Sequence, residues 1–279
     1  MPKNKTNILA VFPIIILIFI KSSYLFAQHN NVQFTAVSTG ATTGHLADLM
    51  VNNNTAIELN TTLGPFFIPS DGKYQPYITV TPIKVIVRPN ETMTYPIMGY
   101  CVDIHRPPIS NGKFLPKFEE WITPSTLPNY WNPSPSKGWT PSTIDNYLIP
   151  GTEVSLKSAI NVDKYPQEAA NVLFTAIQKI SLAFESLKNI GSLETVLSSK
   201  PENEKEGVLQ QTFWIYTSLI QGKAYEKEEF IAKMKEQINN KSNNSIKSLT
   251  LEESVNLEKG LDDLWSSFQQ VGTLAKLFK

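Results

Sequence analysis

The hydrophobic pattern of this chain changes its period along the sequence, and this change limits the fold more than any other feature. Up to residue 104, short runs rich in Val, Ile, Thr and aromatic residues alternate with turn residues; from residue 163, apolar residues recur at helical spacing. A period of two is typical of strands with one buried face, and a period near 3.6 is typical of amphipathic helices. We therefore expect an α+β protein with its strands before its helices.

Six strands are predicted in the first part, and the spacing of their turns favours an immunoglobulin-like β-sandwich over residues 30–105. In the last predicted strand, Met93, Tyr95, Ile97 and Cys101 share one parity, so the Cys101 side chain is expected to face inward. The predicted strands are Val32–Val37, His45–Val51, Thr55–Leu59, Tyr77–Val80, Ile83–Val87 and Thr92–Ile104.

Residues 106–151 form a connector of different composition, with nine prolines between positions 107 and 150. Proline neither donates to a strand ladder nor continues a helix, so an irregular segment is expected. Its aromatic residues have two interpretations: they pack onto a domain, or they form an exposed stacking platform for a sugar. We favour packing. The candidate stacking residues are Trp121, Tyr130, Trp131 and Trp139.

The remaining residues, 152–279, are predicted to form a helical domain. Apolar residues recur at helical spacing from Asp163 until Gly191, which ends the first helix. A second helix is expected over Glu202–Leu219 and a third over Tyr225–Ile238. Thr250 begins a final helix, because with Glu253 it matches the capping-box pattern.

The N-terminus has the pattern of a secretory signal peptide over residues 1–27. Lys3 and Lys5 precede the apolar run Ile8–Ile20, and the small residue Ala27 precedes a polar stretch. The run is shorter than the roughly 20 apolar residues of a membrane-spanning helix. We therefore expect a secreted or cell-surface protein with no stable membrane span after signal cleavage.

Composition argues against several classes of function. Lys plus Arg and Asp plus Glu both total 25, so the basic surplus typical of nucleic-acid binding is missing. Three histidines and a single cysteine are too few for an ordinary zinc site, and we expect neither a metal nor a cofactor. An exported chain usually carries paired cysteines or none, so the lone Cys101 is either a buried inert thiol or a reactive one.

Two short segments of the sequence form a pair of candidate motifs. Gly99–Asp103 carries an aromatic residue before Cys101 at the end of the β part, and Val208–Trp214 carries two glutamines and a tryptophan within the second helix. These segments resemble the two motifs of the thioester domains of bacterial surface adhesins. In that family, a cysteine on a strand and a glutamine on a helix form an internal thioester that acylates an amine on a host surface.

The resemblance covers about a tenth of the chain and implies a role for a few residues. It assigns the cysteine position to Cys101 and the glutamine position to Gln210, while the adjacent Gln211 leaves the choice of glutamine open. Trp214 matches the family tryptophan. It lies one helical turn after Gln210, so Trp214, with Tyr100, is expected to shield the bond from water. Where the family usually has Thr before the glutamine and Ala two residues after it, this chain has Leu209 and Thr212.

We therefore expect an adhesion or surface-binding protein, not an enzyme that turns over, with an extracellular protein or glycan surface as its partner. One alternative is a noncovalent β-sandwich binding module in which Cys101 is inert. A second alternative is a cysteine hydrolase that combines Cys101 with His105 or His45 and with Asp103 or Glu58 as the carboxylate.

Overall fold

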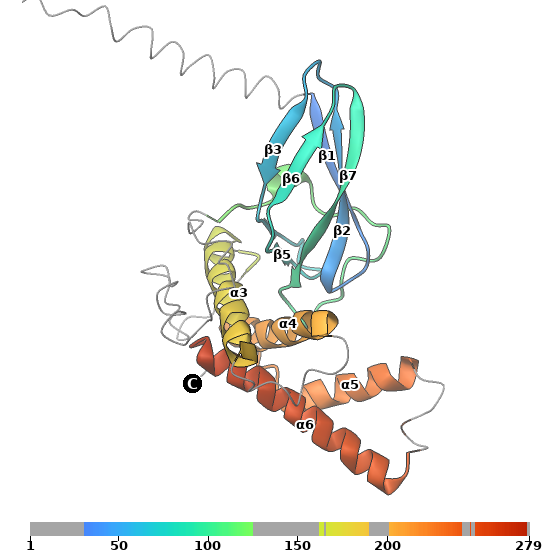
Figure 1. The fold of residues 1–279 in the computed structure, drawn as a ribbon, viewed down its shortest axis with the longest axis vertical. Helices are drawn as coiled ribbons and strands as arrows, with labels where there is room; N and C mark the ends of the chain where they lie inside the picture. The colour runs from blue at the N-terminus through green and yellow to red at the C-terminus, as the bar shows by residue number, and fades with distance from the viewer. Residues whose placement is uncertain are drawn as a thin grey trace, which may run out of the picture.

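The computed structural model describes residues 31–124, 162–164, 166–189, 201–241, 246 and 249–277 of the 279-residue chain. Strands occupy the first part and long helices the second, so the protein has the expected α+β composition. Figure 1 shows the β layers at one end of the molecule and the helices at the other. The expected signal peptide, residues 1–27, lies outside the described residues.

The strands form two antiparallel sheets. One has five strands in the order β1-β2-β7-β5-β4, and the other pairs β3 with β6. In β6, buried and exposed residues alternate strictly, which is why the sequence pattern predicted this strand with its exact bounds. The strands are β1 (Val32–Ser38), β2 (Thr43–Asn53), β3 (Leu59–Leu63), β4 (Phe67–Ile68), β5 (Tyr77–Thr79), β6 (Ile83–Val87) and β7 (Glu91–Cys101).

The predicted strand Thr55–Leu59 is wrong, because β3 begins only at Leu59. A turn precedes it, and the buried side chain of Asn53 organises that turn. Its Oδ1 accepts hydrogen bonds from the backbone N–H and the hydroxyl of Thr55, and its Nδ2 donates to the carbonyl of Ile57. Such local side-chain bonds offer the backbone an alternative to a strand ladder.

β7 is the central strand of the larger sheet and pairs with both β2 and β5. The register between β2 and β7 shifts between His45 and Ala47, so the irregularity lies on β2, and not at Gly99 of β7. At Gly99 the backbone of β5 is very close: a Cβ at this position would lie 2.1 Å from the carbonyl oxygen of Ile78. Only glycine fits there without moving β5.

The start of the proline-rich connector packs against the β part. Leu115 donates its N–H to the carbonyl of Ala36 on β1, and a short 3₁₀ helix, η2 (Phe118–Glu120), follows. The ring of Phe118 stacks on Phe34 of β1 with a centroid distance of 4.3 Å. The β part therefore includes residues beyond 105.

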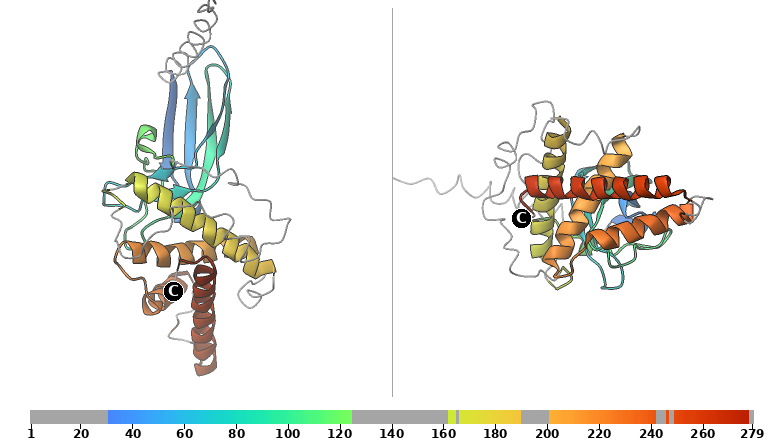
Figure 2. Two further views of the ribbon diagram at one scale, coloured as in Figure 1. Left: turned by 90° about the vertical axis from the view of Figure 1, so that its left-hand side faces the viewer. Right: turned by 90° about the horizontal axis from the view of Figure 1, so that it is seen from below.

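Four long helices complete the described chain: α3 (Pro166–Asn189), α4 (Pro201–Ile220), α5 (Lys227–Lys241) and α6 (Leu251–Leu274). The capping box at Thr250 is confirmed, because Thr250 accepts from the Glu253 N–H and the Glu253 carboxylate accepts from the Thr250 N–H. Both α3 and α4 contact the sheet, and Figure 2 shows α4 crossing below the ends of the strands. Buried apolar residues of the sheets and helices form one continuous core.

Candidate functional site

The candidate site lies where α4 crosses the end of β7. The carboxamide of Gln210 on α4 is paired with the backbone of Cys101, the last residue of β7. The Cys101 N–H donates to Oε1 of Gln210 at 3.0 Å, and Nε2 of Gln210 donates to the Cys101 carbonyl at 2.9 Å. These two bonds close a ring that contains the Cα of Cys101, the atom that carries the CH₂–SH group. The structure thus brings together two residues that are 109 positions apart in the sequence.

Strand pairing explains why this backbone is open to a side chain. The first residue of β2, Thr43, pairs with Tyr100, so β2 starts beside the penultimate residue of β7. The Cys101 N–H also donates to the carbonyl of Thr42 at 2.9 Å, and its own carbonyl accepts from Gln210. The carboxamide therefore shares the Cys101 N–H with the Thr42 carbonyl and provides a donor to the Cys101 carbonyl, just beyond the point where the β2 pairing ends. Both Cys101 and Gln210 are buried, at 0% and 2% exposure.

The surroundings of the sulfur favour the neutral thiol. Burial raises the pKa of Cys101 well above 9.0, and the nearby negative charge of Asp103 raises it further. Tyr77 of β5 is the cross-strand partner of Cys101. Burial is the main cause that raises the pKa of Tyr77 to about 12, and the charge of a Cys101 thiolate acts in the same direction. The hydroxyl oxygen of Tyr77 accepts a hydrogen bond from the Ile109 N–H at 2.8 Å.

An ion-pair network holds the chain directly after Cys101. The carboxylate of Asp103 is 1% exposed; its Oδ2 lies 2.9 Å from Nε of Arg106, and its Oδ1 accepts from the His105 N–H. The guanidinium of Arg106 also makes two bonds to Asp163, at 3.0 and 2.6 Å. Such bidentate pairing restricts the geometry of both partners. The network therefore ties the end of β7 to the segment that precedes α3.

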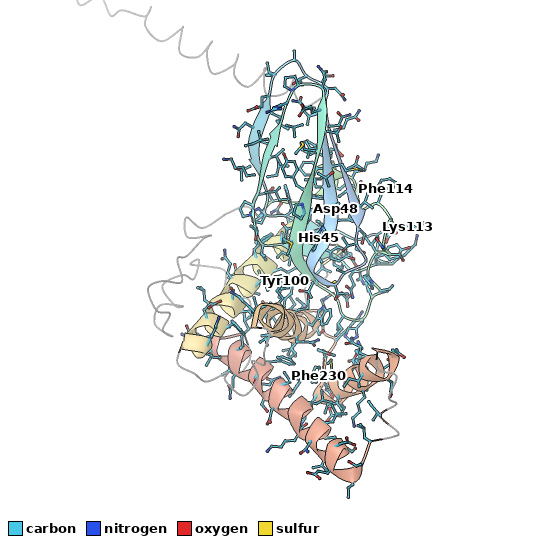
Figure 3. All side chains as sticks on the ribbon, turned by 45° about the vertical axis from the view of Figure 1, so that its right-hand side comes forward. His45, Asp48, Tyr100, Lys113, Phe114 and Phe230 are labelled. Carbon is cyan, nitrogen blue, oxygen red and sulfur yellow. The ribbon has the colours of Figure 1, made fainter. Side chains whose placement is uncertain are left out.

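The two residues expected to shield the site are both buried, Tyr100 at 7% and Trp214 at 9% exposure. Trp214 lies one helical turn after Gln210 on the same face of α4. Its indole Nε1 has no hydrogen-bond partner among the described residues. Tyr100 is labelled in Figure 3, close to the helices. Burial raises the pKa of Tyr100, and the charge of Glu206 on α4 contributes in the same direction.

The two neighbouring glutamines have different surroundings. The side chain of Gln211 is partly exposed and accepts a hydrogen bond from the hydroxyl of Tyr225 at 3.2 Å. Consecutive helical residues point about 100° apart, so Gln210 faces the sheet while Gln211 faces the segment that contains Tyr225. Of the two candidates, Gln210 is the residue that contacts Cys101.

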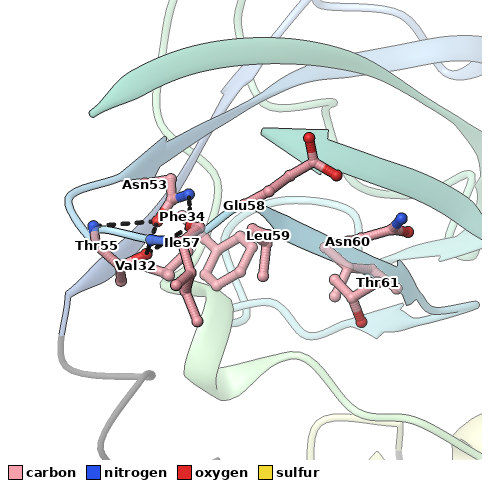
Figure 4. A pocket seen from close by; sticks show the side chains of 10 residues that line it. Val32, Phe34, Asn53, Thr55, Ile57, Glu58, Leu59, Asn60 and Thr61 are labelled. Carbon is pink, nitrogen blue, oxygen red and sulfur yellow. Dashed lines mark hydrogen bonds between the residues drawn. The ribbon is translucent and has the colours of Figure 1, made fainter. Parts of the chain in front are cut away.

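The residues considered for a cysteine hydrolase have other partners. His45 is 46% exposed at its side chain and pairs with Asp48 at 2.8 Å, on the β2 surface that Figure 3 shows. Nδ1 of His105 lies 3.7 Å from the Glu229 carboxylate. Glu58 lines a cleft of about 270 Å³ between the edge strands β1 and β3, drawn in Figure 4. None of the contacts found for these three side chains involves Cys101.

The aromatic residues of the connector are only partly described. Trp121 is 7% exposed; its ring contacts Phe66 and Phe118, and its Nε1 donates to the carbonyl of Pro116. Its faces are covered, so the structure favours packing over stacking at Trp121. Tyr130, Trp131 and Trp139 lie outside the described residues.

A second cleft, of about 500 Å³, was not expected from the sequence. Two exposed aromatic side chains line it: Phe114, at 68% exposure, and Tyr74, at 41%. The charged residues Asp71, Lys113 and Glu120 also line it. Figure 3 places Phe114 and Lys113 on the flank of the β part, apart from Tyr100. The sequence signal that could have indicated this surface is a phenylalanine, Phe114, within the proline-rich segment.

Comparison with known proteins adds no assignment. No protein-family model matches the chain, and searches of curated proteins and of solved structures find no match. Within the described ranges, no helix has both the length and the apolar character needed to span a membrane.

The buried tyrosines lead to a prediction about alkaline pH. Burial raises the pKa values of Tyr77, Tyr100, Tyr216 and Tyr225 above the ordinary value of 10.0. In the unfolded chain these hydroxyls ionise first, so the stability that their neutral forms contribute is complete below pH 10 and is lost as pH rises toward 12. Urea unfolding at a series of pH values should therefore show a falling midpoint over this interval, with tyrosinate absorbance appearing as the protein unfolds. An unchanged midpoint would contradict the burial of these hydroxyls.

Proposed function

We propose that this chain is an exported surface-binding or adhesion protein that captures an amine-bearing target through an internal thioester between Cys101 and Gln210. The observation that carries the proposal is the reciprocal pair of hydrogen bonds, at 3.0 and 2.9 Å, between the Gln210 carboxamide and the backbone of Cys101. A buried glutamine that is hydrogen-bonded to the backbone of a residue with a buried free thiol supplies the two functional groups that a thioester requires.

The hydrogen bonds suit the chemistry of bond formation. Attack of Sγ on the Gln210 carboxamide carbon places negative charge on Oε1, and the Cys101 N–H, 3.0 Å from that oxygen, stabilises this charge. The thiol proton moves to Nε2, the C–N bond breaks, and one ammonia leaves. An unactivated amide reacts slowly, but well-oriented intramolecular reactions reach effective molarities on the order of 10⁵ M or more. A strand end and a helix that share one core would hold the two residues in a fixed relation, which supports such an orientation.

Burial would also preserve the bond once it forms. Water is the competing nucleophile, and the two reacting residues are at most 2% exposed. Tyr100 and Trp214, which flank the pair along β7 and along α4, are themselves buried and would help to exclude water. The resulting chemistry is used once per molecule: Gln210 is the acyl donor, Cys101 carries the acyl group, and a target amine ends the reaction as an amide. The protein would therefore be an adhesive and not an enzyme.

The setting of this activity is inferred from the N-terminal sequence. The signal-peptide pattern over residues 1–27 supports secretion or display at the cell surface, where the partner would be an extracellular protein or a glycan-bearing surface. We also infer that the two sheets form an immunoglobulin-like sandwich. The support for this is that β6 of the smaller sheet packs against β2 and β7 of the larger one.

Intact-mass measurement of the purified protein tests the proposal. The wild-type mass should be lower than the sequence mass by one ammonia, and treatment with methylamine should replace this deficit by the mass of the added amine. A thiol reagent under native conditions should label Cys101 only after amine treatment. The Cys101→Ala variant should show neither the deficit nor the addition. A wild-type protein of full mass, with a thiol that is labelled after unfolding without amine, would refute the thioester.

The cleft lined by Phe114 and Tyr74 favours a second candidate function, noncovalent binding of a glycan or a protein. Exposed aromatic rings beside charged side chains are common in such sites, because they combine apolar contact with hydrogen bonding. Binding of cells or glycans that is lost in Phe114→Ala but retained in Cys101→Ala would support this function in place of covalent capture.

A further inference from the structure

Glu206 is a second side chain of α4 that faces the end of the sheet. It precedes Gln210 by four residues, so the two side chains share one face of the helix. Its carboxylate lies against β2: a Cβ built on Gly44 would be 2.8 Å from Oε2 of Glu206. Gly44 also has a φ of +75°, a conformation that favours glycine. The absence of a side chain at Gly44 thus makes room for a carboxylate next to the candidate site.

The carboxylate has no cationic partner among the described residues. Its neighbour Lys205 pairs with Glu185 of α3 instead. Glu206 is partly exposed, whereas Cys101 and Gln210 are buried. A negative charge held at the partly open side of a buried reactive pair would attract a positively charged ligand.

We propose that Glu206 binds the incoming nucleophile and accepts a proton from it, and that the site consequently selects cationic primary amines such as a lysine side chain of the target. This inference rests on the proposed thioester and deepens it by naming a further catalytic residue and the charge that it selects. Hydroxyl groups of serine or of sugars are neutral and would lack the charge attraction that draws an ammonium group to the carboxylate.

During capture, Glu206 would transfer one proton from the attacking nitrogen to the leaving sulfur. The bound ammonium first loses one proton to solvent and becomes nucleophilic. Its nitrogen attacks the thioester carbon, and the charge on the carbonyl oxygen is stabilised by the Cys101 N–H, the donor that is 3.0 Å from Oε1 of Gln210. The attacking nitrogen is now positively charged, and it passes a second proton to the Glu206 carboxylate. As the C–S bond breaks, the sulfur takes up that proton, and the third proton remains on the new amide.

The thiolate is a poor leaving group here, which makes the proton transfer important. The same burial that raises the pKa of Cys101 disfavours release of a charged sulfur. A carboxylic acid formed on Glu206 during the attack supplies the proton that the leaving sulfur requires. Removing this carboxylate should slow capture without changing the groups that form the thioester.

The test compares two primary amines on the wild-type protein and on Glu206→Gln. Methylamine is almost entirely protonated near pH 7, whereas methoxyamine is neutral and similar in size. The ammonia deficit of each protein is measured first by intact mass, and the rate of amine addition is then followed. Glu206→Gln should retain the deficit and react with methylamine about 10²-fold more slowly. It should lose less rate with methoxyamine, which also passes a proton to the carboxylate but is not attracted by its charge. Glu236→Gln, at an exposed position on α5, is the matched control and should react like the wild type.

Each other outcome overturns the inference or the function on which it rests. If the wild type lacks the ammonia deficit, the thioester itself is refuted. If the deficit forms in both proteins and Glu206→Gln captures methylamine at the wild-type rate, the role of Glu206 is refuted while the thioester stands. Equal slowing with both amines would refute the selection of cationic amines, and loss of the deficit in a folded Glu206→Gln protein would make Glu206 a structural residue. Glu206→Asp, which keeps the carboxylate, should recover part of the preference for methylamine.

Discussion

Replacing Gln210 by glutamate should abolish the ammonia deficit and lower the free energy of unfolding by about 3 kcal/mol at neutral pH. The carboxylate cannot donate to the Cys101 carbonyl, which at present accepts a bond of 2.9 Å from Nε2. It would also place an unpaired negative charge at a position that is 2% exposed. Urea unfolding and intact mass measure the two effects.

The pH dependence of this variant follows from the same contacts. Burial raises the pKa of the new carboxyl group, so its neutral form persists in the folded state above the ordinary value of about 4.3. A neutral acid donates one hydrogen bond, so the stability of the variant should rise as pH falls toward 4 and should be lost as pH rises. If the variant is destabilised equally at neutral pH and at pH 4, this explanation is contradicted.

The adjacent residue supplies the matched control. Gln211 uses its side-chain oxygen to accept from the Tyr225 hydroxyl, a bond that a carboxylate also accepts. Gln211→Glu should therefore retain the ammonia deficit and change the free energy of unfolding by no more than about 0.5 kcal/mol. If Gln211→Glu loses the deficit and Gln210→Glu keeps it, the donor glutamine has been assigned to the wrong residue.

Replacing Gly99 by alanine should lower the free energy of unfolding by about 3 kcal/mol or more. The new Cβ would lie 2.1 Å from the carbonyl oxygen of Ile78 and 2.9 Å from Cδ1 of Leu46. The first of these atoms belongs to the backbone of the paired strand, so the clash is relieved only by separating β5 from β7. Cys101 lies two residues later on the same strand, and thioester formation should fall as well.

Gly260→Ala is the control for this substitution. Gly260 lies within α6, and a Cβ there meets no atom within 4 Å. Because alanine has the higher helix propensity, this variant should be unchanged or more stable by up to about 1 kcal/mol. Chemical denaturation compares the two directly, and a tolerated Gly99→Ala would show that β5 does not approach β7 as closely as described.

Much of the fold could be predicted because its signals are local. The strict alternation of β6 and the helical period of α3 belong to single segments, and the capping box at Thr250 and Glu253 is complete within four residues. Local reasoning failed where a side chain redirected the backbone, as Asn53 does before β3. It also missed the two-residue strand β4, which is too short to show any period.

The features of the candidate site also divide into those that local sequence predicts and those that depend on tertiary contacts. The sequence by itself determined the inward parity of Cys101, the helical positions of Gln210 and Trp214, and the order of the β and α parts, because each depends on neighbours along the chain. Only the tertiary structure decided which glutamine meets Cys101, and it placed the Glu206 carboxylate against Gly44. The physical reason is that these contacts depend on where α4 crosses the strand ends, and that crossing is set by the shared core and not by any segment alone.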